Sequence, residues 1–217
     1  MHIEPGVLNA SKVVFANVTA IGTLTPFVPK VFKRPDTIVK VALAAVFFSV
    51  FMEMFHLPVG ASELHFVGAS AVYFTFGFIP TLFGFAIGLA LQGLLFEPQD
   101  LVHLGVNSLS LMLPLIATHA LVGRHFFNGE DRTKVSWTSI VKFDAPYYAG
   151  VVAMVGFWLS LGQESTPFYN WLEFAISYLP LVLLEPVFTY FVVRYLKKSE
   201  DSPVVRNATA IPELAIA

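Results

Sequence analysis

The chain has no cysteine, and it has few charged residues for its length. Without cysteine among its 217 residues, disulfides, thiolate metal sites and cysteine nucleophiles are excluded. Charged residues make up 13% of the chain, whereas a soluble domain has about 25%. Such a sequence offers too little polar surface to solvate a globule of this size, and lipid is the alternative solvent. The net charge of −2 gives no reason to expect nucleic acid as a partner.

The sequence also lacks the motifs of ATP hydrolysis and of common hydrolytic enzymes. It contains no G-x-x-x-x-G-K-[ST], no G-x-S-x-G and no H-E-x-x-H. If the protein transports a substrate uphill, the energy must therefore come from a partner or from an ion gradient. Residues 1–9 lack the basic start of a secretory signal peptide, so we expect the mature chain to begin at Met1.

Hydrophobic residues are abundant instead, at 56% of the chain, and the mean hydropathy is +0.69. A membrane-spanning helix needs about 20 mostly apolar residues. Seven segments qualify as candidates: 10–29, 39–57, 64–79, 81–97, 103–123, 145–162 and 169–196. The third and fourth are short and meet at Pro80, so a re-entrant pair is the alternative there. We predict an all-α, polytopic membrane bundle of about seven transmembrane helices, forming a single domain over 1–198.

The basic residues test this topology. Seven spans place twelve of the 13 Lys and Arg on one side of the membrane: Lys30, Lys33, Arg34, Lys40, Arg124, Arg132, Lys134, Lys142, Arg194, Lys197, Lys198 and Arg206. The opposite loops contain acidic residues and no Lys or Arg. The positive-inside rule then predicts an outside N-terminus and a cytoplasmic C-terminus in a multi-pass protein of the cell (inner) membrane. Residues 199–217 are expected to form a flexible cytoplasmic tail.

The N-terminal segment 1–9 is predicted to bind metal. His2 follows a free N-terminal residue, so three nitrogens lie on adjacent atoms: the Met1 amine, the His2 amide and the His2 imidazole Nδ1. A free amine has a pKa of about 7.7–8.0 and releases its proton readily to a metal. One further imidazole would complete a square-planar site of four nitrogens. That geometry favours Ni(II), Cu(II) or a related late transition ion over Mg(II), Ca(II) or tetrahedral Zn(II).

Further candidate residues lie at the predicted outer ends of the helices. His56, His65 and His103 are found there, whereas His119 and His125 fall toward the cytoplasm. Each outer histidine is either a metal ligand or a ring placed at the headgroup level, where it meets water. His56 and His103 are also candidates for a supporting place behind the ligands. A Pro/Gly turn over 57–64 precedes His65, which is expected to begin the next helix and to point its ring into the bundle.

Two polar residues are candidates for supporting roles at this outer face. Glu53 precedes His56 by three residues on the same helical face, so it is expected to orient or neutralise that ring. Asn107 follows Gly105 at the outer start of a helix. It is either an orienting residue behind a metal ligand or a polar contact between helices.

Several residues inside the predicted spans have structural interpretations. Glu185 lies deep in the last span, so it must be protonated, hydrogen-bonded or paired. Asp144 and Pro146 are expected to cap the start of the span at 145–162. Small residues four apart, at Gly84 and Gly88, favour close packing of helices.

These features together resemble the CbiM/NikM family, the substrate-capture (S) components of cobalt and nickel energy-coupling factor (ECF) ABC transporters. The similar segments are Met1 to Gly6, Pro58 to His65, Leu94 to Phe96, Leu104 to Asn107 and the helix around Glu185. The chain departs from the family pattern in four places. Glu4-Pro5 reverses the usual order, Ser110 replaces a second Asn, the cytoplasmic loop 124–142 has no match in the pattern, and Pro186 follows Glu185 where Gly is expected.

The resemblance implies a function, a ligand set and partners. It implies that the N-terminus folds into the bundle from outside, and that Met1, His2 and His65 hold the metal. Transported Ni(II) or Co(II) is the ligand, and no resident cofactor is expected. The implied partners are a pair of ABC ATPases, a coupling transmembrane subunit and a small accessory membrane protein. The protein itself would bind and reorient its substrate, and not catalyse a reaction.

Two other functional classes remain open from the sequence. A membrane metalloenzyme would use the outer histidines with Glu53 or Glu63 as a general base. A metal sensor or interaction protein would keep the site and lack the transport partners. Nickel and cobalt both accept nitrogen ligands, so the sequence leaves the choice between them open.

Overall fold

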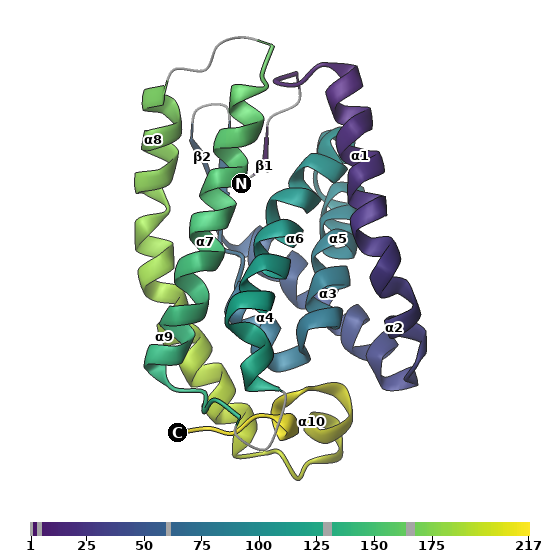
Figure 1. The fold of residues 1–217 in the computed structure, drawn as a ribbon, viewed down its shortest axis with the longest axis vertical. Helices are drawn as coiled ribbons and strands as arrows, with labels where there is room; N and C mark the ends of the chain where they lie inside the picture. Colours follow the sequence, from purple (N-terminus) through teal and green to yellow (C-terminus); the bar gives the residue numbers. More distant parts are fainter. Residues whose placement is uncertain (1, 4–5, 60–61, 128–131, 164–167) are drawn as a thin grey trace.

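The computed structural model describes residues 2–3, 6–59, 62–127, 132–163 and 168–217, and it is a bundle of helices (Figure 1). The helices in chain order are α1 (Ala10–Leu24), α2 (Val28–Phe32), α3 (Pro35–Met54), α4 (Ala69–Phe76), α5 (Phe78–Leu95), α6 (Leu104–Leu121), α7 (Trp137–Ser160), α8 (Phe168–Ser177), α9 (Leu179–Lys197) and α10 (Pro203–Ala208). Short 3-10 turns connect them: η1 (Thr25–Phe27), η2 (Pro98–His103), η3 (Gly123–Phe126) and η4 (Ile211–Glu213). Within the described residues, six helical stretches are long and apolar enough to cross a membrane. The predicted polytopic helical membrane bundle is confirmed.

The third predicted span, 64–79, is wrong as a helix. It is replaced by strand β3 (Ser62–His65), a short link and the eight-residue helix α4. Two glycines with positive φ bound that helix, Gly68 at 61° and Gly77 at 87°. A side chain on Gly68 would also collide with Phe51, because an added Cβ would lie 2.4 Å from its ring. These glycines break the helical path that the apolar run alone predicted.

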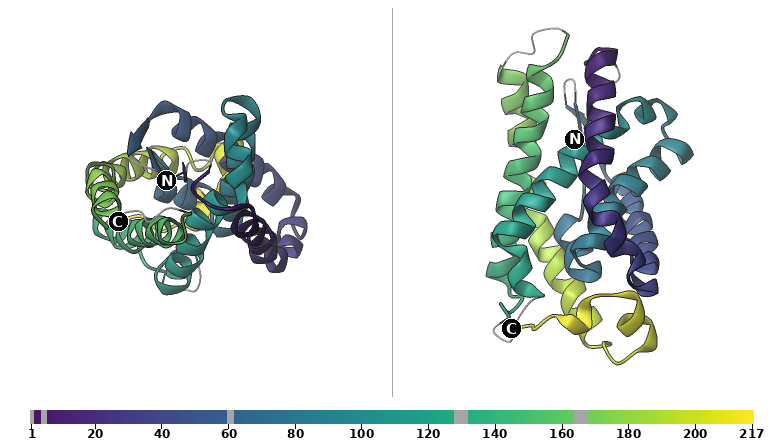
Figure 2. Two further views of the ribbon diagram at one scale, coloured as in Figure 1. Left: turned by 90° about the horizontal axis from the view of Figure 1, so that it is seen from above. Right: turned by 45° about the vertical axis from the view of Figure 1, so that its right-hand side comes forward.

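A small antiparallel sheet enters the bundle from the end opposite to the C-terminus (Figure 1). Its strand order is β1-β3-β2, with β1 at His2–Ile3 and β2 at His56–Val59. In the register, His2 lies opposite Glu63 and His56 lies opposite His65. Seen along the bundle, the N-terminal strand lies within the ring of helices (Figure 2, left). Ile3 is fully buried there.

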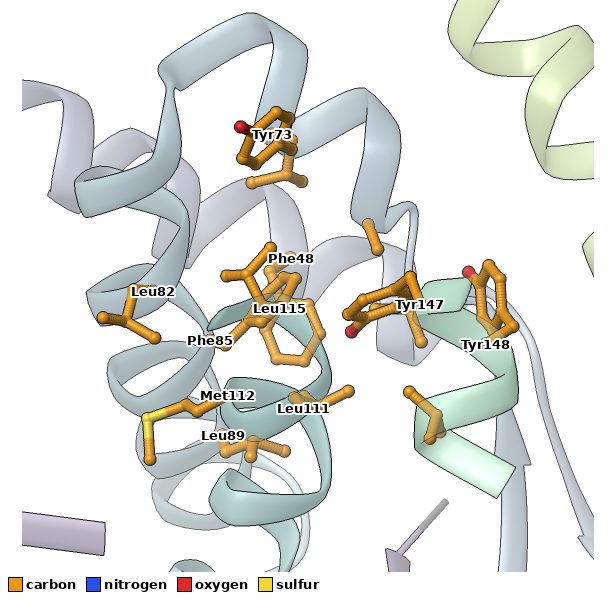
Figure 3. Packing of buried hydrophobic residues seen from close by; sticks show 14 of the residues in the cluster. Phe48, Tyr73, Leu82, Phe85, Leu89, Leu111, Met112, Leu115, Tyr147 and Tyr148 are labelled. Atoms are coloured by element: carbon orange, nitrogen blue, oxygen red, sulfur yellow. The ribbon is translucent and has the colours of Figure 1, made fainter. Parts of the chain in front are cut away.

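The core lies where α3, α5, α6 and α7 meet, and it is rich in aromatic and branched side chains (Figure 3). Phe48 and Phe85 pack with ring centroids 4.9 Å apart. As expected, Gly84 and Gly88 allow close packing, here of α5 on α3. A Cβ on Gly84 would lie 2.7 Å from the Ala44 side chain. On the outer surface of α1, Phe15, Val18 and Ile21 are exposed, as a lipid-facing helix requires.

Helix α7 begins earlier than the sequence predicted. Ser136 caps it through a reciprocal hydrogen-bond pair with Ser139, a capping box, so the helix begins at Trp137. Asp144 and Pro146 therefore lie inside the helix, and their predicted role as its start is wrong. Asp144 is buried and faces other polar groups of the bundle.

The C-terminal segment also differs from the expectation of a flexible tail at 199–217. Residues 203–208 form α10, and Ile211 and Leu214 are buried against the bundle. The Ala210 amide donates to the Thr75 carbonyl at 2.7 Å, and the backbone around residue 216 pairs with Val135. The expectation failed because the few apolar residues of this polar segment find a surface only in the folded bundle.

Candidate metal centre

His65 lies on β3 and its side chain is only 2% exposed. The expectation that it begins a helix is wrong, but its ring does lie inside the protein. Its Nδ1 is 3.2 Å from the Met52 carbonyl oxygen, which can only accept a hydrogen bond. This contact places a proton on Nδ1, so Nε2 is the ring nitrogen that a metal could bind, in exchange for its contact with Glu63. Nε2 lies 3.0 Å from Oε2 of Glu63.

Glu63 connects His65 with a second histidine. Its Oε1 lies 2.9 Å from Nδ1 of His56, whose side chain is 47% exposed. The two imidazole rings are nearly parallel, with centroids 6.0 Å apart. The hydrogen bond to Glu63 raises the pKa of His56 above its usual value, against a smaller opposing effect of burial. Glu63 therefore holds one exposed and one buried ring at the same time.

The predicted role of Glu53 is performed by Glu63 instead. Glu53 is exposed near the end of α3, and its influence on His56 is only that of a nearby charge. The chain leaves the helix at Phe55, so the three-residue spacing from Glu53 to His56 no longer places both on one helical face. Glu63 and His65, two residues apart on a strand, do share a face.

The backbone of the N-terminal strand is held on both of its edges. On one edge β1 pairs with β3, which places the main chain of His2 opposite Glu63. On the other edge, the Ile3 amide donates to Oδ1 of Asn107 at 3.0 Å, and Nδ1 of His103 donates to the Ile3 carbonyl at 2.8 Å. Asn107 and His103 are both buried and were both expected to support a metal ligand. In the structure they fix the main chain beside His2.

Helix α6 is itself held firmly where it carries Asn107. The Gly105 amide donates to Oδ1 of Asn17 on α1 at 2.8 Å. A Cβ on Gly105 would lie 2.5 Å from the Asn17 Cα, so only glycine allows this approach. The Asn107 side chain therefore meets Ile3 from a fixed helix start.

The described side chains do not complete a metal site by themselves. No group of three or more His, Cys, Asp and Glu side chains converges within the described ranges. Met1 lies outside those ranges, and of His2 only the main chain is described. A metal bound next to His65 would therefore need further donors, and the strand pairing brings the main chain of His2 to β3.

Sequence comparison identifies the family. A family model described as the cobalt uptake substrate-specific transmembrane region, CbiM, matches residues 2–202. The chain belongs to the CbiM family. It is thus a multi-pass membrane component of metal uptake, as the resemblance implied, and membership of this family of transport components argues against an enzyme. No curated protein matches the chain in a separate search.

Two solved structures have the same fold as this CbiM protein. One is described as a transition metal transporter, with a TM-score of 0.73, 22% identity, and coverage of 94% of this chain and 96% of that one. The other is described as a truncated transition metal transporter, with a TM-score of 0.72, 21% identity, and coverage of 92% and 99%. At these identities the likeness concerns the fold.

A second polar cluster lies deeper in the CbiM bundle. Of its residues, the sequence analysis singled out only Glu185 as a buried charge that needs a partner. Glu185 on α9 is fully buried and accepts hydrogen bonds from the Ser70 amide at 2.9 Å and from the Tyr148 hydroxyl. Ser70 Oγ lies 3.1 Å from Asp144 Oδ2 and 2.7 Å from Thr189 Oγ1. Of the alternatives predicted for Glu185, the structure shows hydrogen bonding.

One hydrogen bond connects this region of the CbiM bundle to the outer histidine. The Tyr178 hydroxyl donates to the His65 carbonyl at 3.2 Å, and Tyr178 packs against Tyr148 with ring centroids 5.4 Å apart.

His119, by contrast, lies at the other end of the molecule. It is stacked on Phe78 and lies 2.7 Å from the Tyr73 hydroxyl. The histidines thus fall into two ends, as the sequence predicted.

Proposed function

We propose that this protein captures Ni(II) or Co(II) at the outer face of the membrane and passes it to partner subunits that hydrolyse ATP. The proposed ligands are the Met1 amine, the His2 amide and imidazole nitrogens, and Nε2 of His65. The observation that carries the proposal is the double clamp on Ile3 by Asn107 and His103. These two hydrogen bonds hold the N-terminal strand against β3. The main chain of His2 then lies opposite Glu63, two residues before His65 on β3.

The clamp explains how a short N-terminal segment can bind a metal tightly. A free N-terminus has many conformations, and ordering it costs free energy at the moment of binding. Pairing with β3 on one side and with α6 and η2 on the other means that this ordering is already done. Binding then replaces the water of the ion by nitrogen ligands in a site that the bundle shields. The reaction is capture followed by release, with no covalent chemistry.

The family and the sequence support a transporter with partners. The family description names cobalt uptake and a substrate-specific region. The sequence has no nucleotide-binding motif, so ATP hydrolysis would be performed by a pair of ABC ATPases through a coupling transmembrane subunit, with or without a small accessory membrane protein. A metalloenzyme is less well supported, because Glu63 is already bonded to two histidines and Glu53 lies apart from them.

The decisive experiment measures Ni(II) and Co(II) binding to the purified protein with its native N-terminus, beside a form with two extra residues before Met1. The extension removes the amine from its position without changing any side chain. We expect stoichiometric binding in the native form and its loss in the extended form. Equal binding by both forms would contradict the proposed site. A control with two residues added after Ala217 should bind like the native form.

A further inference from the structure

The proposed nitrogen ligands would leave a positive charge on the bound metal. A dication held by an amine, two imidazoles and a deprotonated amide keeps a net charge of +1. His65 is 2% exposed, so this charge would lie largely away from water. A buried charge without a partner is costly, because the protein interior solvates ions far less well than water does. A carboxylate in direct contact would remove the cost.

Glu63 is placed to be that carboxylate. Its side chain is only 11% exposed, and its Oε2 lies 3.0 Å from Nε2 of His65, the ring nitrogen available to a metal. Metals bind imidazole nitrogen at about 2.0–2.1 Å. An ion that takes the place of the proton between Nε2 and Oε2 therefore lies beside the carboxylate, which binds it after a small shift of its oxygen. The strand register also places Glu63 opposite the main chain of His2.

His56 keeps the carboxylate in position. Its Nδ1 contacts Oε1, the carboxylate oxygen of Glu63 that does not contact His65 Nε2. One carboxylate oxygen is thus anchored to an exposed ring while the other remains directed at the buried one. When a metal takes Nε2 of His65, the contact between Nε2 and Oε2 is lost, and the carboxylate keeps its contact with His56. His56 and Glu63 come from the two strands of the β2–β3 hairpin, because His56 is on β2 and Glu63 is on β3.

We propose that Glu63 neutralises the captured dication, and that His56 is a positioning residue which holds Glu63 for this task. The inference rests on the proposed function, because it requires the ion to bind at His65. Glu63 makes the occupied site electrically neutral, with one charge from the deprotonated amide and one from the carboxylate. A divalent ion is thereby selected over a monovalent one by charge, in addition to the selection by ligand geometry.

The test compares Glu63→Gln with Glu53→Gln in the full-length protein with its native N-terminus. Both variants remove one negative charge from the same end of the molecule, but only Glu63 contacts the histidines. Glutamine can accept from His56 and donate to His65, so the hairpin should stay folded, and thermal unfolding checks this. The dissociation constant for Ni(II) is measured at low and high salt. Co(II) serves as a second probe.

We expect Glu63→Gln to weaken Ni(II) binding about tenfold or more at both salt concentrations, because a buried contact is little screened. Glu53→Gln should have a small effect at low salt that disappears at high salt, because exposed charges are screened. His56→Ala should lie between the two, since it keeps the charge but frees the carboxylate.

Two results would overturn the inference while leaving the proposed function intact. One is equal Ni(II) binding by Glu63→Gln and wild type, with the wild type still sensitive to the N-terminal extension. The other is a loss in Glu63→Gln that vanishes at high salt, as it does for a distant charge. If the wild type itself bound no Ni(II) or Co(II), the proposed function would fail as well, so the two failures are distinguishable.

Discussion

The outer histidine cluster and the deeper carboxyl cluster both contain buried polar side chains, yet they are built differently. At the outer cluster, Glu63 holds two rings, and one of them, His56, is about half exposed. At the deeper cluster, Glu185 is fully buried and its donors include the main chain of Ser70. The first has a side that faces water and can exchange its partners. The second is closed to water, and Glu185 accepts its hydrogen bonds from groups of the fold itself.

The difference indicates separate roles. Polar groups that must release and accept an ion need partners that can be replaced at low cost, such as a carboxylate shared between two rings. Polar groups that join helices in a membrane need permanent partners, because an unpaired group in hydrocarbon costs several kcal/mol. This difference supports the proposal that the substrate is captured at the outer cluster. The deeper cluster joins α4, α7 and α9 through Ser70, Asp144 and Glu185.

The largest expected effect is on substrate binding. His65→Ala removes the buried ring that donates Nε2, and we expect more than a 100-fold loss of Ni(II) or Co(II) affinity, beyond the roughly 10- to 100-fold typical of residues behind a ligand. The bundle should remain folded, as judged by thermal unfolding in detergent. His125→Ala, at the other end of the molecule, is the matched control and should bind like wild type. Equal affinities would remove the outer cluster from the binding site.

Glu185→Ala should affect stability most, and binding only through loss of folded protein. It leaves the Ser70 amide and the Tyr148 hydroxyl without their acceptor, at about 1–3 kcal/mol for each unsatisfied donor. We expect the free energy of unfolding to fall by about 3 kcal/mol. Glu185→Gln keeps an acceptor oxygen and should lose less. Selective loss of metal affinity in a fully folded Glu185→Ala protein would contradict the division between the clusters.

Asn107→Ala tests whether the N-terminal strand is positioned by α6. The Ile3 amide loses its acceptor, which costs about 1–3 kcal/mol when the donor stays buried. Because this hydrogen bond helps to hold strand β1 in place, its loss should loosen β1 and leave the rest of the bundle intact. We therefore expect metal affinity to fall about tenfold or more with little change in thermal stability. Asn107→Asp retains the acceptor oxygen and is the control. A lower melting temperature with unchanged affinity would indicate a contact between helices only.

The smallest effect concerns the packing behind Asn107. Gly105→Ala forces a methyl group against the Asn17 backbone on α1, and overpacking of this kind costs about 1–3 kcal/mol. Gly22→Ala, on α1, has no atom within 4 Å of its added Cβ and should leave stability unchanged or slightly higher. Thermal unfolding of the two variants measures the difference. Indistinguishable melting temperatures would show that α1 and α6 can separate without cost.

Much of the site was predictable because its residues are close in sequence to features with strong local signals. The Pro/Gly turn before His65 and the His at position two are the features from which the candidate metal site was predicted. Asn107 was found as a polar residue at a helix start, but its partner, the Ile3 amide, is 104 residues away. Glu63 was named only as a possible base. Its contacts with both His56 and His65 depend on strand β3, whereas the apolar run over 64–79 predicted a helix there.

The sequence by itself determined that this chain enters the membrane, because its composition leaves lipid as the only solvent that suits it. It also determined the two ends of the bundle, since charge is excluded from the hydrocarbon and collects in the loops. Only the tertiary structure decided that the third pass is a strand and a short helix, that Glu63 and not Glu53 meets the histidines, and that the C-terminal segment is packed. These outcomes depend on contacts between residues far apart in the chain, such as Ile3 with His103 and Ala210 with Thr75. Local composition does not determine such contacts.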